Sequence, residues 1–181
     1  MKALIQKLVE TPSPSGREEP IRQVIRAEVE AYADEVRVDA LGNLIVSKGQ
    51  ATAGGMKVML AAHVDEIGVI VSHIDEHGFV RFMPIGGVRP LMCLGGRVRF
   101  LNGQKGVIAA MPQDDPNKLP GFDQLYIDVG ATKKEEVPVR VGDMGVFDRP
   151  FSDLGNRLVS KAMDDRIGAA VMIEALHLWK G

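Results

Sequence analysis

The sequence predicts an α/β domain that is interrupted by a β-rich insertion. Residues 57–62 form a nearly continuous apolar run, which is typical of a central strand covered on both faces. Residues 67–154 contain only short β-like runs separated by turn signals. Helical spacing of apolar residues occurs before these two regions and returns after them. The predicted order along the chain is therefore α/β, then β, then α/β again.

Two helices are predicted near the N-terminus. Residues 2–9 form the first, which ends where a run rich in Pro, Ser and Gly begins. The second is longer, because apolar residues recur at helical spacing from Ile21 to Val36. Ser15 and Glu18 have the spacing of a capping box, which predicts that this helix begins directly after Ser15.

Short runs of β-forming residues predict the remaining strands. One run precedes the apolar segment 57–62, and the others fall in the insertion between Gly- and Asn-rich turns. Many short strands at this spacing are typical of a compact barrel or sandwich. The predicted strands are 44–47, 68–74, 79–83, 97–100, 106–110, 125–129 and 143–147.

Composition excludes several classes of protein. The 181 residues are 45% hydrophobic and 25% charged, which is ordinary for a globular chain. The net charge is −2 and no Lys/Arg block occurs, so nucleic acid is not expected as a partner. No apolar stretch reaches membrane-spanning length and the N-terminus does not resemble a signal peptide, which predicts a cytoplasmic protein. The single cysteine, Cys93, excludes an intrachain disulfide and is expected to be buried.

His63 and Asp65 form the first candidate site. They are two residues apart at the carboxyl end of the predicted central strand, where α/β proteins bind ligands. A neutral imidazole is a good ligand for zinc or cobalt, and a nearby carboxylate can orient the ring. The alternative is a loop histidine paired with a local carboxylate for structural reasons.

The second candidate site is Asp164-Asp165-Arg166, at the start of a helix predicted over 163–179. A carboxylate at such a junction can bridge two cations and hold them close together. The alternative is a helix N-cap followed by a surface arginine, because Asp is a preferred capping residue.

Several short motifs follow one another along the chain. They are P-S-G-x-E within 11–18, D-x-x-G-N within 39–44, H-x-D-E-I-G within 62–68, two landmarks at 127–131 and 141–143, and K-A-x-D-D-R-x-G at 161–168. In this order they resemble the signatures of the glutamyl aminopeptidase family, cytoplasmic metallopeptidases that include the tetrahedral aminopeptidases. The similarity covers the whole chain, and the β-rich insertion falls where that family has one.

The resemblance implies a particular fold. Residues 1–66 and 155–181 would form part of a three-layer α/β/α metallopeptidase domain. Residues 67–154 would form an inserted PDZ-like β-barrel, which mediates oligomer contacts in the family. A homo-oligomer is therefore expected.

The resemblance also implies roles for individual residues. His63 would ligate one metal and Asp164 would bridge two, while Asp65 would be the catalytic aspartate that holds His63 in its ligating tautomer. Asp165 and Arg166 would have supporting structural roles. Two divalent ions, zinc or cobalt, would activate a water for hydrolysis of the N-terminal peptide bond of a peptide substrate.

The family pattern continues with a glutamate pair, an aspartate and a histidine, which do not occur in the same context here. We therefore expect weak or partial metal occupancy and little activity from these 181 residues alone. One alternative is a non-catalytic scaffold or oligomerisation protein on the same fold. A second is an endoglucanase, a label carried by some relatives, but no pair of carboxylates suited to glycoside cleavage is identified.

Overall fold

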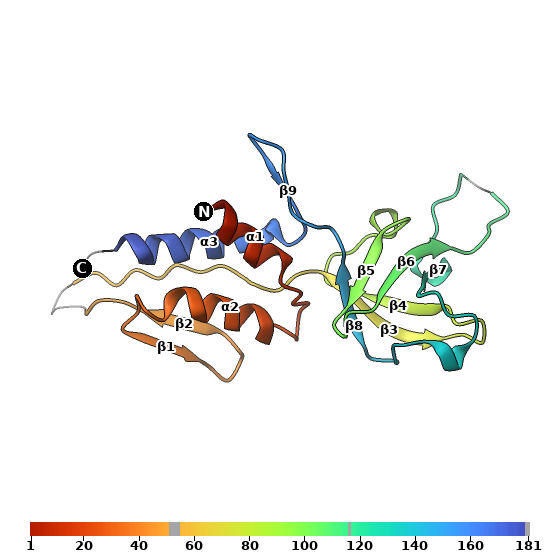
Figure 1. The fold of residues 1–181 in the computed structure, drawn as a ribbon, viewed down its shortest axis with the longest axis horizontal. Coiled ribbons are helices and arrows are strands. Elements are labelled where there is room, and N and C mark those ends of the chain that lie inside the picture. The colour runs from red at the N-terminus through yellow and green to blue at the C-terminus, as the bar shows by residue number, and fades with distance from the viewer. Residues whose placement is uncertain (51–54, 116, 180–181) are drawn as a thin grey trace. The chain divides into compact units, whose positions relative to one another are not determined.

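The computed structural model describes residues 1–50, 55–115 and 117–179 of the chain. These residues form two compact units (Figure 1). Unit 1 comprises Met1–Asp65 and Phe151–Gly181, and unit 2 comprises Glu66–Pro150. Within the described ranges, no helix is both long and apolar enough to cross a membrane.

Unit 1 is built around three helices. Apolar residues at helical spacing give each helix one buried face; α1, for example, buries Ile5, Leu8 and Val9. These faces pack into a common core with Ala169, Ala170 and Ile173 of the last helix. The elements are α1 (Lys2–Glu10), α2 (Glu19–Val29), β1 (Glu35–Val38), β2 (Leu44–Ser47), β9 (Ser152–Asp153), β10 (Leu158–Val159) and α3 (Met163–Leu178).

The predicted capping box of the second helix is wrong. The hydroxyl of Ser13 accepts a hydrogen bond from the Ile21 N–H at 3.2 Å, so Ser13 supplies the capping oxygen of α2. Glu18 accepts from the Gly16 N–H instead of closing a box with Ser15. The helix also ends at Val29, earlier than predicted, because the following residues enter the antiparallel β1–β2 hairpin.

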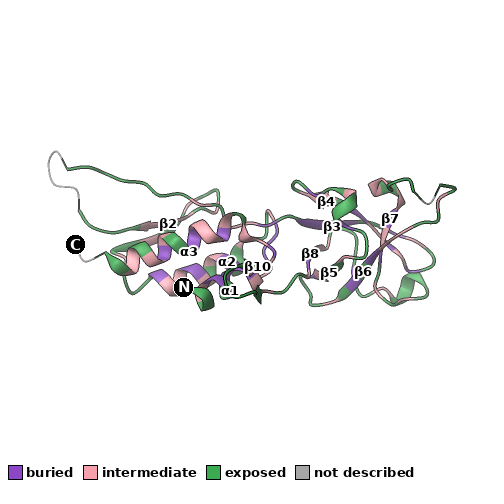
Figure 2. Cartoon of the chain, turned by 90° about the horizontal axis from the view of Figure 1, so that it is seen from above, coloured by how far each residue is buried: buried purple, intermediate pink, exposed green. Residues whose placement is uncertain are grey.

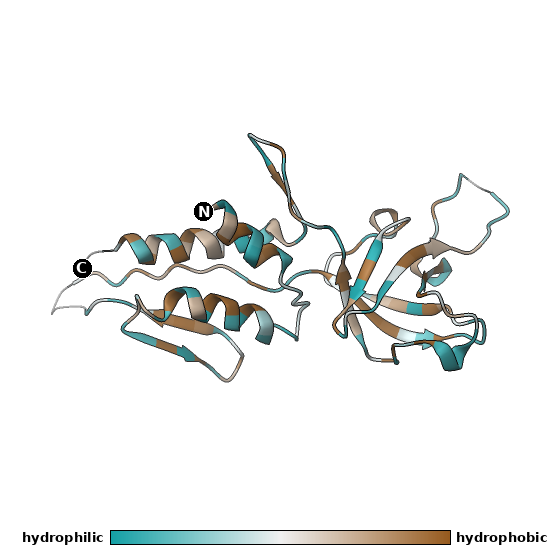
Figure 3. Ribbon diagram, in the orientation of Figure 1, coloured by the Kyte–Doolittle hydropathy of each residue, from teal (hydrophilic) through white to brown (hydrophobic). Residues whose placement is uncertain are grey.

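Residues 57–62, the predicted central strand, do not form a strand. They are extended, and none of the described residues pairs with them in a sheet. The segment is exposed (Figure 2), with Val58 at 73% and Met59 at 88%, although its composition is apolar (Figure 3). A strand requires backbone hydrogen bonds to a neighbouring strand, and neither β1 nor β2, which pair with each other, pairs with this segment. The apolar pattern therefore predicted the extended backbone but not its lack of partners.

Unit 2 is a closed antiparallel barrel, and all six predicted runs form its strands. The order around the barrel is β3-β4-β7-β6-β5-β8, so neighbouring strands are not always consecutive in the sequence. The strands are β3 (Gly68–Ile74), β4 (Val80–Ile85), β5 (Arg97–Phe100), β6 (Lys105–Ala110), β7 (Leu125–Asp128) and β8 (Met144–Phe147). Short 3-10 turns lie at Pro90–Met92, Phe122–Gln124 and Lys134–Glu136.

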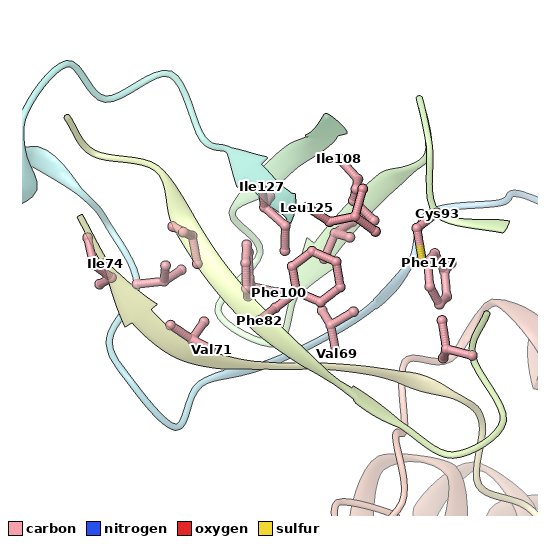
Figure 4. Packing of buried hydrophobic residues seen from close by; sticks show 14 residues of the cluster. Val69, Val71, Ile74, Phe82, Cys93, Phe100, Ile108, Leu125, Ile127 and Phe147 are labelled. Carbon is pink, nitrogen blue, oxygen red and sulfur yellow. The ribbon is translucent and has the colours of Figure 1, made fainter. Parts of the chain in front are cut away.

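Inward-facing side chains from every strand fill the barrel (Figure 4). Phe100 on β5 pairs across the sheet with Gly145 on β8. A Cβ at Gly145 would lie 2.7 Å from Val98 Cγ1 and 3.2 Å from Phe100 Cδ1, so only glycine leaves room for the ring. Cys93 is fully buried, as predicted, and burial raises the pKa of its thiol.

The ion pair between Asp148 and Lys105 in unit 2 predicts that the stability of the barrel depends on pH. Lys105 Nζ lies 2.8 Å from its carboxylate, and the hydrogen bond from Lys105 holds the pKa of Asp148 below its ordinary value. A lowered pKa stabilises the folded state above about pH 4, and this stabilisation is lost as the pH falls through the folded-state pKa. We expect Asp148→Asn to cost about 1 kcal/mol at neutral pH, and progressively less as the pH falls through the folded-state pKa of Asp148. Urea unfolding at neutral and at acidic pH measures this.

The exposed Asp114 provides the matched control for that measurement. Asp114→Asn is expected to leave stability unchanged, within about 0.5 kcal/mol, at both pH values. An equal loss at neutral and acidic pH in Asp148→Asn would contradict the assignment, because it would not depend on the charge of Asp148.

Candidate metal centre

The structure brings His63, Asp65 and Asp164 together within unit 1. His63 Nδ1 lies 2.9 Å from Asp65 Oδ1, and His63 Nε2 lies 3.2 Å from Asp164 Oδ1. Asp164 is 101 residues from His63 in the sequence. The imidazole therefore has one carboxylate at each ring nitrogen.

Asp65 has a second partner that the sequence did not predict. Its Oδ2 accepts a hydrogen bond from the hydroxyl of Ser15, so each carboxylate oxygen has its own partner. Ser15 is 50 residues from Asp65, and its spacing from Glu18 pointed to a helix cap. No local signal in the sequence indicates this contact.

The two aspartates in the first turn of α3 have different contacts. Asp165 Oδ1 accepts a hydrogen bond from the Gly168 N–H at 3.1 Å. This contact caps the start of the helix, as aspartate commonly does. A Cβ at Gly168 would lie 2.5 Å from the same oxygen, so glycine permits the close approach. The Asp164 side chain is 96% exposed. Asp165 thus caps the helix, while Asp164 presents its carboxylate to His63.

Arg166 is completely buried, so the alternative of a surface arginine is wrong. Its guanidinium donates to the carbonyl oxygens of Leu8 (2.7 Å), Thr11 (2.5 Å) and Val64 (2.9 Å). A fourth, longer contact of 3.5 Å reaches the carbonyl of Ser13. Val64 lies between His63 and Asp65, so Arg166 joins the site segment to the end of α1 and the turn that follows it.

The hydrogen bonds around His63 change the ionisation of both partners. Burial lowers the pKa of His63, but the hydrogen bonds with Asp65 and Asp164 outweigh this effect and the pKa is raised. The hydrogen bond from Ser15, with a further contribution from His63, lowers the pKa of Asp65 against the effect of its partial burial. Asp65 is therefore a carboxylate at neutral pH.

The His63 imidazole and the Asp164 carboxylate are both of a donor type that zinc accepts, and His63 Nε2 lies 3.2 Å from Asp164 Oδ1. Asp65 at Nδ1 is the carboxylate–histidine arrangement that orients metal-binding histidines. Across residues 1–50, 55–115 and 117–179, no group of three or more His, Cys, Asp or Glu is placed to hold a metal. The described residues thus supply part of a donor set.

A family model for M42 glutamyl aminopeptidases matches residues 42–181. The chain is also 38% identical over 188 residues to the lysyl aminopeptidase of Pyrococcus furiosus, covering 95% of this chain and 53% of that protein. The chain therefore belongs to the M42 glutamyl aminopeptidase family. It spans about half the length of the curated relatives it matches.

Solved structures of related proteins share this fold. An aminopeptidase from Desulfurococcus kamchatkensis is 42% identical with a TM-score of 0.90, over 98% of this chain and 51% of that one. The TET1 peptidase of Pyrococcus horikoshii is 33% identical with a TM-score of 0.84, and the match covers 97% of this chain and 55% of that one. It is described as assembling into a tetrahedron or a large octahedral shell. An endoglucanase of Thermotoga maritima is 36% identical with a TM-score of 0.84, and the match covers 96% of this chain and 53% of that one.

Proposed function

We propose that the chain is the N-terminal portion of a cytoplasmic aminopeptidase that uses two divalent ions, zinc or cobalt, to remove N-terminal residues from peptides. The observation that carries the proposal is the pair of donors, His63 Nε2 and Asp164 Oδ1, with Asp65 behind the ring. Membership of the M42 glutamyl aminopeptidase family supports this chemistry.

Each of these residues has a defined task in the proposed reaction. His63 would hold one metal through its Nε2 lone pair, and the exposed carboxylate of Asp164 would offer its oxygens to both metals. Asp65 would accept a hydrogen bond from the Nδ1–H of His63 and so leave Nε2 without a proton. When bound, the metals would lower the pKa of a water and polarise the scissile carbonyl. Among the described residues no group of three or more His, Cys, Asp or Glu is placed to hold a metal, so the proposed reaction needs further ligands and a general base.

Metal binding by the 181-residue chain tests the site directly. Two protein donors form half of a tetrahedral zinc shell, so we expect binding far weaker than the roughly 10 kcal/mol or more of a complete structural site. His63→Ala and Asp164→Ala are each expected to weaken Co²⁺ or Zn²⁺ binding at least about tenfold in isothermal titration calorimetry. His77→Ala is the matched control, because His77 lies on an exposed turn of unit 2.

Two results would contradict this part of the proposal. Unchanged metal binding in both site variants would show that His63 and Asp164 are not ligands. Tight stoichiometric binding with robust peptidase turnover by the 181 residues would show that the donor set is complete.

The activity is tested on the protein encoded by the complete reading frame. Hydrolysis of aminoacyl p-nitroanilides that disappears in His63→Ala supports the aminopeptidase. Hydrolysis of β-glucan instead would support the endoglucanase alternative. Assembly without either activity or metal binding would support the non-catalytic scaffold.

We also propose that the protein is a homo-oligomer whose contacts include the barrel of unit 2. The TET1 relative assembles into large shells, which supports this expectation. Unit 2 exposes apolar side chains that association would cover, among them Leu91 at 64% and Val141 at 63%. Light scattering after size exclusion measures the assembly, and a strict monomer at all concentrations would contradict it.

A further inference from the structure

Ser15 has no assigned part in metal binding, yet its hydroxyl donates to Asp65 Oδ2. It is half-buried in the turn between α1 and α2, far from His63 in the sequence. The other oxygen of Asp65 contacts His63 Nδ1. Ser15 is thus connected to the metal-facing nitrogen of His63 through a single carboxylate.

The turn that carries Ser15 is held at several points. Arg166 donates to the carbonyls of Thr11 and Ser13, and the hydroxyl of Ser13 donates to the Pro12 carbonyl at 2.7 Å. The Arg17 N–H donates to the Pro14 carbonyl at 2.9 Å. Because the backbone is fixed on both sides of Ser15, its hydroxyl has a defined position relative to Asp65.

The ring of His63 lies between two competing acceptors. Asp65 Oδ1 is 2.9 Å from Nδ1 and Asp164 Oδ1 is 3.2 Å from Nε2. A neutral imidazole carries one proton, so only one of these carboxylates can accept a hydrogen bond from it. A proton on Nε2 would occupy the lone pair that a metal needs.

We propose that Ser15 is a positioning residue that acts through Asp65 to keep the proton of neutral His63 on Nδ1. The carboxylate torsion of an aspartate is broad, so an Asp65 with one anchored oxygen can rotate away from the ring. The hydroxyl of Ser15 anchors the second oxygen and holds the first against Nδ1. Without it, Asp164 competes more effectively for the proton and Nε2 loses its free lone pair. The importance of that lone pair rests on the proposed function.

The hydrogen bond from Ser15 also has an electronic effect of the opposite sign. The hydrogen bond from Ser15 lowers the pKa of Asp65, which makes this carboxylate a weaker acceptor for His63. If this electronic effect were larger than the positional one, removing Ser15 would strengthen the bond between Asp65 and Nδ1. The two effects therefore predict opposite changes in the tautomer.

Imidazole ¹⁵N NMR of the metal-free 181-residue chain at about pH 9, well above the ordinary histidine pKa, measures the tautomer. His63→Gln identifies the signal among the four histidines. We expect mainly Nδ1–H in the parent chain, a shift toward Nε2–H in Ser15→Ala, and recovery in Ser15→Thr, which keeps a hydroxyl. An unchanged tautomer, or more Nδ1–H, in Ser15→Ala overturns the proposal.

Metal titration provides the second readout. Ser15→Ala is expected to weaken Co²⁺ binding about tenfold, while Ser47→Ala, on the exposed end of β2, leaves it unchanged. If Ser15→Ala fails to fold by circular dichroism, Ser15→Cys keeps the size of the side chain and removes the strong donor. A tautomer shift in a chain that binds no metal would contradict the proposed function and still support the role of Ser15. Metal binding without a tautomer shift in Ser15→Ala would support the proposed function and contradict the role of Ser15.

Discussion

Arg166→Met is expected to destabilise unit 1 by about 3–5 kcal/mol, because each buried carbonyl oxygen left without a donor costs about 1–3 kcal/mol. The methionine keeps much of the side-chain volume but removes the donors to the carbonyls of Leu8, Thr11 and Val64. Because Arg166 is completely buried, water cannot replace these hydrogen bonds without opening the core. A loss of this size is a large fraction of the stability of an ordinary domain.

Chemical denaturation followed by hydrogen exchange measures this loss. Protection of the α1 and α3 amides is expected to fall in Arg166→Met, while the barrel amides keep theirs. Arg157→Ala, at an exposed position of the same unit, is the control and is expected to change stability by less than about 0.5 kcal/mol. A loss below about 1 kcal/mol in Arg166→Met would show that the guanidinium is not needed to hold these segments together.

Phe100→Ala is expected to destabilise unit 2 by about 3–5 kcal/mol. The ring is 1% exposed and lies in the centre of the barrel among side chains from several strands (Figure 4). Gly145, which faces it across the sheet, has no side chain to fill the space that the ring leaves. The cost therefore includes a cavity as well as the lost burial.

Leu101→Ala gives the matched comparison, because Leu101 follows Phe100 but is 42% exposed. We expect it to cost less than about 1 kcal/mol. Urea unfolding monitored by hydrogen exchange of β5 and β8 distinguishes the two variants. Equal losses would contradict the assignment of Phe100 to the barrel core.

The six strands of the barrel could be predicted from local sequence alone. Each of its six strands follows from a short run of β-forming residues between turn signals, and all six are present. The strand order could not be read in the same way, because β3 pairs with both β4 and β8. Such pairing depends on contacts between residues distant in the sequence.

In unit 1, patterns predicted the helices more reliably than their ends and partners. The periodicity of α1 and α3 located both, but the α2 cap came from Ser13 instead of Ser15. The apolar run 57–62 predicted a paired central strand, and the structure shows an extended segment with exposed side chains. The local pattern of apolar residues indicates which side chains a segment can bury. A strand also needs a neighbouring strand with which its backbone can form hydrogen bonds.

The sequence by itself determined the family motifs and the candidate residues His63, Asp65 and Asp164. Only the tertiary structure decided that Asp164 contacts His63, that Asp165 caps α3, and that Ser15 contacts Asp65. It also decided that Arg166 is buried at the junction of α1, the following turn and the site segment. Motifs record residue types at fixed spacing. His63 and Asp65 are two positions apart, but the hydrogen bonds from Ser15 to Asp65, between His63 and Asp164, and from Arg166 to Leu8 join residues 50, 101 and 158 positions apart, which only the folded chain brings together.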